Sequence, residues 1–192
     1  MGNSNSNANC LCNDLVNQGE ELQGKKETKA ERLPWDNEED PRRHLSEAYY
    51  AQERRCLENS GLAYEEFKID NIIIDDEGHY VRTFQVGMQT GANLPAKEKM
   101  VMTHGYGGSI VMFWPIMKEL AKDYHLIMFD ILGMGSSSRP EFTLENAVDA
   151  NDFFVSWMEK WRQSIGILNE KFILCAHSFG GYISGHYAKR YP

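Results

Sequence analysis

One stretch near the C-terminal end constrains the fold most strongly: Lys171-Phe-Ile-Leu-Cys-Ala-His-Ser-Phe-Gly-Gly-Tyr182. Its apolar part, Phe172 to Ala176, predicts a buried strand, and the glycines after Ser178 predict the start of a helix. A strained turn between a strand and a helix presents a serine hydroxyl above a parallel sheet, which is the arrangement called a nucleophile elbow. The stretch therefore predicts an α/β fold with Ser178 as a candidate nucleophile.

The match to the elbow pattern G-x-S-x-G lacks its first glycine, because Ala176 stands at that position. Alanine is still small enough for a crowded turn, and Gly180 lets the helix and the strand approach closely. Any strand–helix turn can contain Ser-x-Gly, so an ordinary structural turn is the alternative to a catalytic one.

Composition excludes several classes of function. The chain has 192 residues, 42% of them hydrophobic, which favours one globular core. A net charge of −8 and the lack of a Lys/Arg-rich run argue against nucleic acid as a partner. No apolar run reaches the ~18 residues of a membrane span. The cysteines show no disulfide-framework spacing and no secretory segment is found, so we expect a cytoplasmic protein.

Residues 1–34 are polar and aperiodic, and we expect them to be disordered because they offer too little apolar surface. The first six residues match the N-myristoylation pattern, with Gly2 as the acceptor. Cys10 and Cys12 lie near enough to take a second acyl chain, and two lipid signals give stable anchoring. The expectation is a lipidated, membrane-associated tail. A featureless polar tail is the alternative, and a Cys-x-Cys metal site is a weaker one.

Residues 35–62 are expected to form an N-terminal helical segment, with a helix over 41–58 that Gly61 terminates. Its arginines are expected to be solvated, with acidic lipid as an alternative contact. The predicted buried face, at helical spacing, consists of Leu45, Tyr49, Gln52 and Cys56.

Strand patterns alternate with helix patterns along the remaining chain. A hairpin is predicted from 67–74 and 80–86, with Gly78 supplying a positive φ in the turn. Short buried strands are predicted at 99–103 and 125–129.

Three helices are predicted between and after these strands. The first runs from Pro115 to Tyr124 and buries Ile116, Met117 and Leu120. Thr143 is expected to cap the second, which extends to Gly166. Its predicted stripe is Ala147, Ala150, Phe154, Trp157, Trp161 and Ile165. The last helix, over 179–191, is expected to bury Ile183, Tyr187 and Tyr191 and to expose His186.

The loop His104-Gly105-Tyr106-Gly107-Gly108 is a second chemical signal. A glycine-rich loop after a strand leaves backbone N–H groups free, and two donors aimed at a developing oxyanion are worth roughly 3 kcal/mol each in acyl transfer. Dinucleotide and phosphate loops do not fit, because the G-x-G-x-x-G and Gly-Lys-Ser/Thr spacings are absent. We expect His104 to order this loop rather than to act as a base.

Asp130 follows the predicted strand over 125–129 and has two possible roles. It is either a catalytic acid or, as we favour, an acceptor for N–H groups of the loop that follows. The sequence has no ligand cluster with metal spacing, so neither a metal nor a cofactor is expected.

Three motifs taken together resemble the α/β-hydrolase superfamily: His104 to Gly108, Asp130-x-x-Gly-x-Gly-x-Ser-x-Arg-Pro140, and His177-Ser-Phe-Gly-Gly181. Within it, the sequence is most similar to the branch of lysophosphatidic-acid acyltransferases and lipase co-activators that also includes a cardiolipin deacylase. The resemblance implies that residues 63–192 form the N-terminal part of an α/β-hydrolase domain, truncated after the elbow helix. Its sheet would be mostly parallel, with an antiparallel N-terminal hairpin.

The resemblance also implies a serine-dependent carboxylic ester hydrolase or acyltransferase that acts on acyl lipids at a membrane or lipid-droplet surface. Ser178 would attack an acyl carbonyl, and the N–H groups of Tyr106 and Phe179 would hold the oxyanion. His177 and Gly180, with the glycine-rich loop, would support this site. The alternative is a non-catalytic protein that binds lipid or regulates a lipase.

The family places its triad acid and histidine after the serine, and this chain reaches Pro192 soon after Ser178. We therefore expect both partners beyond Pro192, and neither His177 nor His186 is expected to be the base. The predicted strand Phe172–Ala176 would then leave an unpaired apolar edge, so we expect the isolated chain to be poorly soluble.

Overall fold

The computed structural model describes residues 43–89 and 95–192, with side chains from residue 48 onward. The expectations for the 1–34 tail, including lipidation at Gly2, Cys10 and Cys12, lie outside the described residues, as does the start of the 35–62 segment.

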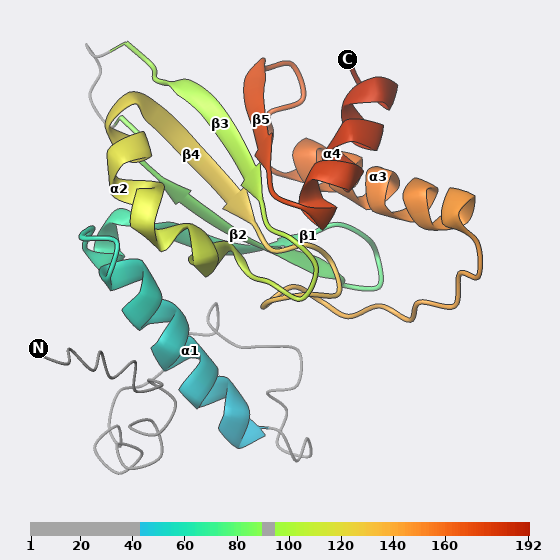
Figure 1. Cartoon of the computed structure of the whole chain (residues 1–192), viewed down its shortest axis with the longest axis horizontal. Helices are drawn as coiled ribbons and strands as arrows, with labels where there is room; N and C mark the ends of the chain where they lie inside the picture. The colour runs from blue at the N-terminus through green and yellow to red at the C-terminus, as the bar shows by residue number, and fades with distance from the viewer. Residues whose placement is uncertain (1–42, 90–94) are drawn as a thin grey trace, which may run out of the picture. The chain divides into compact units, whose positions relative to one another are not determined.

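Five strands form one sheet in the order β1-β2-β4-β3-β5 (Figure 1). β1 pairs with β2, and β2 with β4, in antiparallel fashion, whereas β3 runs parallel to both β4 and β5. The predicted antiparallel hairpin and parallel sheet are confirmed, and each strand lies within about one residue of its predicted bounds. The strands are β1 (Lys68–Ile73), β2 (Tyr80–Val86), β3 (Glu98–Thr103), β4 (Tyr124–Phe129) and β5 (Phe172–Ala176).

Helices connect and cover the strands. The 3-10 turn η2 (Tyr64–Glu66) leads into β1, and η3 (Ile110–Phe113) leads into α2. Pro115 lies in the first turn of α2, as predicted. The α-helices are α1 (Arg43–Glu58), α2 (Trp114–Asp123), α3 (Ala147–Ser164) and α4 (Phe179–Arg190).

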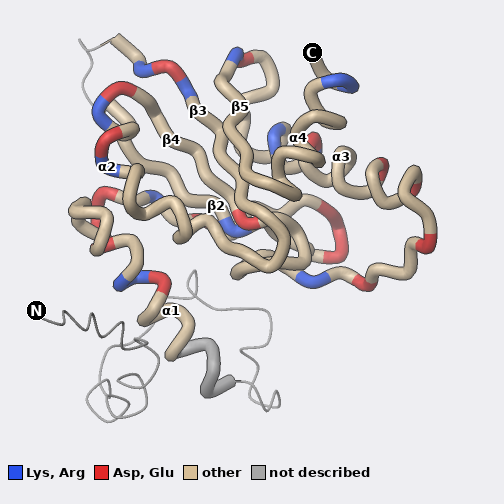
Figure 2. The backbone as a smooth tube through the Cα atoms, viewed as in Figure 1, with Lys and Arg blue, Asp and Glu red and all other residues tan. Residues whose placement is uncertain are grey.

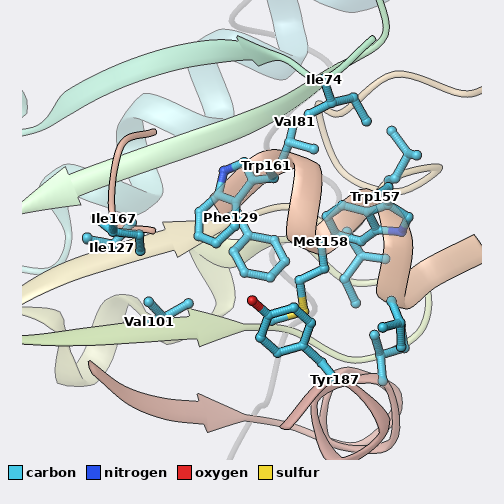
Figure 3. Packing of buried hydrophobic residues seen from close by; sticks show 14 residues of the cluster. Ile74, Val81, Val101, Ile127, Phe129, Trp157, Met158, Trp161, Ile167 and Tyr187 are labelled. Atoms are coloured by element: carbon cyan, nitrogen blue, oxygen red, sulfur yellow. The ribbon is translucent and has the colours of Figure 1, made fainter. Parts of the chain in front are cut away.

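Strand periodicity divides the core into two layers, because successive side chains point to opposite faces. Met100 and Met102 pack with Leu57 of α1 and Met117 of α2. Val101 packs on the other face, which α3 and α4 cover. Figure 3 shows that layer, with Phe129 of β4 close to Trp157 and Trp161 and Tyr187 of α4 beside Met158. Figure 2 shows β3 and β4 largely free of charged residues beyond their first residues.

The start of α3 differs from its prediction. Asn146, not Thr143, is the N-cap, and its Oδ1 accepts hydrogen bonds from the N–H groups of Val148 and Asp149 at 3.1 and 3.0 Å. Either residue type can cap a helix, so the choice depends on where the chain bends towards the sheet. As a result Ala147 is exposed, while Trp157 and Trp161 are buried as predicted.

Other helix faces were predicted one position out of phase. α1 buries Glu53 and Leu57, whereas Gln52 is exposed. Ile116 and Tyr191 lie at helix ends and are 44% and 38% exposed, although both were predicted to be buried. Among the described residues, no helix has the length and apolarity needed to span a bilayer.

Candidate active site

Ser178 lies in the turn between β5 and α4 with φ 51° and ψ −118°. It is the one non-glycine residue of the described chain with a positive φ. This conformation costs an L-residue roughly 1–3 kcal/mol and persists only where the surrounding structure enforces it. The Ser178 side chain is exposed, so the turn presents its hydroxyl to solvent above the carboxyl end of β5.

Two glycines let the backbone around Ser178 pack closely. A Cβ on Gly180 would lie 2.3 Å from the carbonyl oxygen of His104, so only glycine allows α4 to approach the end of β3. A Cβ on Gly105 would lie 3.0 Å from His177 Nδ1 and 3.1 Å from Ser178 Cβ. The glycine-rich loop is thus in direct contact with the serine turn.

The structure brings together Tyr106 and Phe179, the two residues whose backbone N–H groups were predicted to hold the oxyanion. The rings of Tyr106 and Phe179 meet edge to face, with centroids 6.1 Å apart. Within the described residues, neither backbone N–H donates a hydrogen bond. An N–H at the start of a helix has no intrahelical acceptor, so the Phe179 group is available to a ligand. The two N–H groups predicted to bind an oxyanion are therefore free of hydrogen-bond acceptors within the described residues.

His104 orients one of these donors. It is fully buried; its Nε2 accepts the Ile131 N–H at 2.9 Å, so its Nδ1 carries the proton and donates to the Gly105 carbonyl at 2.7 Å. The Gly108 N–H donates to the same oxygen at 3.1 Å. Because a peptide unit is planar, fixing the Gly105 carbonyl also fixes the Tyr106 N–H. The loop-ordering role predicted for His104 is what the hydrogen bonds show.

Asp130 is fully buried and has the structural role that we favoured. Its Oδ2 accepts the Ser136 N–H at 2.8 Å and its Oδ1 accepts the Ile110 N–H at 2.6 Å. Burial raises the pKa of Asp130, while the nearby His104 and these hydrogen bonds oppose that rise. Asp130 therefore joins the loop that follows β4 to the end of the glycine-rich loop.

No general base is found among the described residues. The His177 side chain is exposed next to Ser178, and the His177 backbone N–H donates to the Thr103 carbonyl at 3.1 Å. His186 lies on the exposed side of α4, as predicted, and contacts the ring of Tyr182. In the described ranges, no side chain forms a hydrogen bond with the Ser178 hydroxyl. They also contain no group of His, Cys, Asp or Glu side chains that could hold a metal ion.

Residues 99–192 match the family model for the alpha/beta hydrolase fold. Solved structures agree with this match, with TM-scores of 0.56 for a membrane phospholipase A described as a bacterial virulence factor and 0.57 for carboxylesterase CesB of Bacillus subtilis. This chain has the α/β-hydrolase fold. Each of these two structures is 18% identical in sequence to this chain. The phospholipase match covers 77% of this chain and 41% of the phospholipase, and the CesB match covers 75% of this chain and 45% of CesB. At this level of identity they support the fold alone.

The chain is also similar to curated enzymes whose names denote acyl-lipid substrates. A 1-acylglycerol-3-phosphate O-acyltransferase of Arabidopsis thaliana is 37% identical over 117 residues, which is 61% of this chain and 26% of that protein. A (lyso)-N-acylphosphatidylethanolamine lipase of Bos taurus is 41% identical over 93 residues, which is 48% of this chain and 26% of the lipase. The chain thus spans about a quarter of the length of these relatives. The resemblance inferred from the three motifs is confirmed.

Proposed function

We propose that this α/β-hydrolase is a serine-dependent ester hydrolase or acyltransferase that acts on acyl lipids, with Ser178 as nucleophile. The observation that carries the proposal is the exposed Ser178 at φ 51° beside two unused N–H donors. The names of the relatives, an acyltransferase of acylglycerol phosphate and a phospholipid lipase, support acyl lipids as the substrate class.

In the proposed reaction, the triad histidine expected beyond Pro192 takes the Ser178 hydroxyl proton while Ser178 Oγ attacks the acyl carbonyl carbon and forms a tetrahedral intermediate. Its oxyanion accepts hydrogen bonds from the N–H groups of Tyr106 and Phe179, each worth roughly 3 kcal/mol in the transition state. The N-terminus of α4 adds a favourable partial positive charge. The same histidine gives this proton to the departing alcohol, which leaves an acyl-enzyme. It then deprotonates the water or second alcohol that attacks the acyl-enzyme, so that the acyl product leaves and the Ser178 hydroxyl is restored.

A fluorophosphonate probe tests the nucleophile, because it phosphonylates only activated serines. We expect Ser178 to be labelled in a full-length form that includes the triad histidine, and Ser178→Ala to abolish the labelling. Ser164→Ala, which changes an exposed serine at the end of α3, is the matched control and should leave it unchanged. Labelling that persists in Ser178→Ala contradicts the assignment.

A second candidate function is lipid binding or lipase regulation without turnover. It is favoured by the observation that no described histidine or carboxylate contacts the Ser178 hydroxyl. It predicts that the protein binds acyl-lipid vesicles while Ser178 stays unreactive, so the probe and a vesicle sedimentation assay separate the two functions.

We further propose that the protein is cytoplasmic and is held at a membrane or lipid-droplet surface by acylation at Gly2 and at Cys10 or Cys12. The N-terminal sequence pattern supports this. Intact mass of protein made in a eukaryotic host tests it, and an unmodified Gly2 contradicts it.

A further inference from the structure

A buried ion pair attaches α1 to the sheet. Glu53 of α1 is 4% exposed, Arg82 of β2 is 1% exposed, and Arg82 Nη2 lies 2.7 Å from Glu53 Oε1. The Arg82 guanidinium also lies over the rings of Tyr50 and Phe84. Burial raises the pKa of Glu53, and the interactions with Arg82 oppose that rise. A buried pair of this kind is weak evidence for stability, so its other contacts are informative.

The second oxygen of Glu53 faces the loop that follows β4. Glu53 Oε2 accepts a hydrogen bond from Ser136 Oγ at 3.1 Å, and the Ser136 N–H donates to Asp130 Oδ2 at 2.8 Å. A Cβ on Gly135 would lie 2.1 Å from that same Asp130 oxygen, so the loop is closed tightly over the carboxylate. Burial and the nearby Asp130 also raise the pKa of Tyr49, one turn before Glu53 on α1.

Asp130 continues this chain of contacts to the proposed oxyanion hole. Its other oxygen holds the Ile110 N–H at 2.6 Å, at the end of the glycine-rich loop, and the next residue, Ile131, donates to His104. α1 and this loop also line one open cleft of about 390 Å³. Four buried side chains therefore connect α1 to the Gly105–Tyr106 peptide: Glu53, Ser136, Asp130 and His104.

We propose that Glu53 of α1 is a positioning residue for the oxyanion hole, acting through Ser136 and Asp130 on the backbone of the glycine-rich loop. This inference rests on the proposed function of Ser178. α1 is then part of the catalytic apparatus, although none of its residues contacts the reacting atoms.

Two variants break the link and preserve the fold. Ser136→Ala removes the hydroxyl that reaches Glu53 and keeps the N–H that Asp130 accepts. Replacing Glu53 and Arg82 together by Met removes the ion pair without leaving a lone buried charge. Glu58→Gln, an exposed glutamate on the same helix, is the matched control. Trp161→Phe is the control for general destabilisation, because it loses a hydrogen bond to Thr83 in the opposite core layer.

Two measurements on the full-length form used for the probe experiment decide the inference. Hydrogen exchange at the Gly108, Ile110 and Ser136 amides should speed up at least tenfold in both link variants, with no change at Tyr182 of α4. Phosphonylation of Ser178 should slow roughly ten- to hundredfold in the same variants, as expected when catalytic groups shift by about 1 Å. Both controls should leave the loop exchange and the labelling rate at wild-type values.

The possible outcomes separate the two proposals. Unchanged loop exchange, a rise of exchange across the whole chain, or slower labelling in Trp161→Phe overturns the positioning role. Faster loop exchange with unchanged labelling of Ser178 also overturns it. If wild-type Ser178 is unreactive, the proposed function fails, and the exchange measurement alone still decides whether Glu53 holds the loop.

Discussion

Ser178 combines two properties that an ordinary turn would not need together. Its side chain is exposed, and its backbone adopts a conformation that favours glycine. Natural turns of this kind relieve the strain by using glycine, as the described chain does at its other positive φ values, for example Gly78 and Gly133. A serine that keeps the strain is better explained by chemistry at its hydroxyl than by folding.

The strain at Ser178 has a measurable size. We expect Ser178→Gly to raise the free energy of unfolding by about 1 kcal/mol relative to Ser178→Ala, because glycine adopts φ 51° without a steric cost. Urea denaturation of the two variants measures the difference. Equal stability of the two variants would show that the turn holds no strain.

Alanine substitutions at two glycines of α4 test how closely this helix approaches β3, with Gly180 at the contact and Gly185 as the control. Gly180→Ala should lower the free energy of unfolding by about 3 kcal/mol, because its Cβ would meet the His104 carbonyl. Gly185 has no heavy atom within 4 Å of an added Cβ, so Gly185→Ala should stabilise the helix by about 1 kcal/mol. Urea denaturation with circular dichroism measures both, and a similar effect of the two substitutions contradicts the close approach.

At the scale of the elements, α3 and α4 are joined by one carboxylate. Glu159 of α3 accepts hydrogen bonds from Arg162 at 2.7 and 2.8 Å and from the Tyr187 hydroxyl of α4 at 2.7 Å. The sequence pattern had marked Tyr187 as buried but gave no sign of its partner, since Glu159 reads as a solvated position between two core tryptophans. A buried hydroxyl needs an acceptor, and this contact supplies it.

The Glu159 contacts make stability depend on pH. Hydrogen bonds from Arg162 lower the pKa of Glu159 from 4.5 to about 2. A lowered pKa stabilises the folded state above pH ~4.5, and that contribution disappears as the pH falls towards 2. Glu159→Gln should therefore lower the free energy of unfolding by about 2 kcal/mol at pH 7 and change it little near pH 2. Denaturant titrations at several pH values test this, with exposed Glu145→Gln as the control; a pH-independent loss contradicts it.

At the scale of the whole molecule, the strands of the sheet and the order of the motifs could be predicted from the sequence. Strand patterns are local, and glycines such as Gly105 and Gly180 mark close backbone approaches that any α/β fold of this kind requires. Glu53 and Arg82 were not predictable, because a charged residue looks solvated until a distant partner is known. The cap at Asn146 was missed for a related reason, since Thr143 satisfies the same local rule.

β5 gives the whole chain a testable property. Among the described strands it pairs only with β3, and its other edge carries unpaired backbone groups. Because such edges template further pairing, we expect the 192-residue chain alone to self-associate. Sedimentation velocity over a range of concentrations measures this. A monodisperse monomer at every concentration contradicts the expectation.

The position of β3 between β4 and β5 also bears on how the molecule forms. β3 and β5 pair in register from Lys99 with Phe172 to Thr103 with Ala176, although the whole of α2, β4 and α3 separates them in the chain. Contacts so distant in sequence close late, because the entropy of a long loop is lost before they form. The glycine-rich loop is synthesised early but meets Ser178 only when this last parallel pairing is complete. A newly made chain should thus acquire its secondary structure well before its glycine-rich loop contacts Ser178.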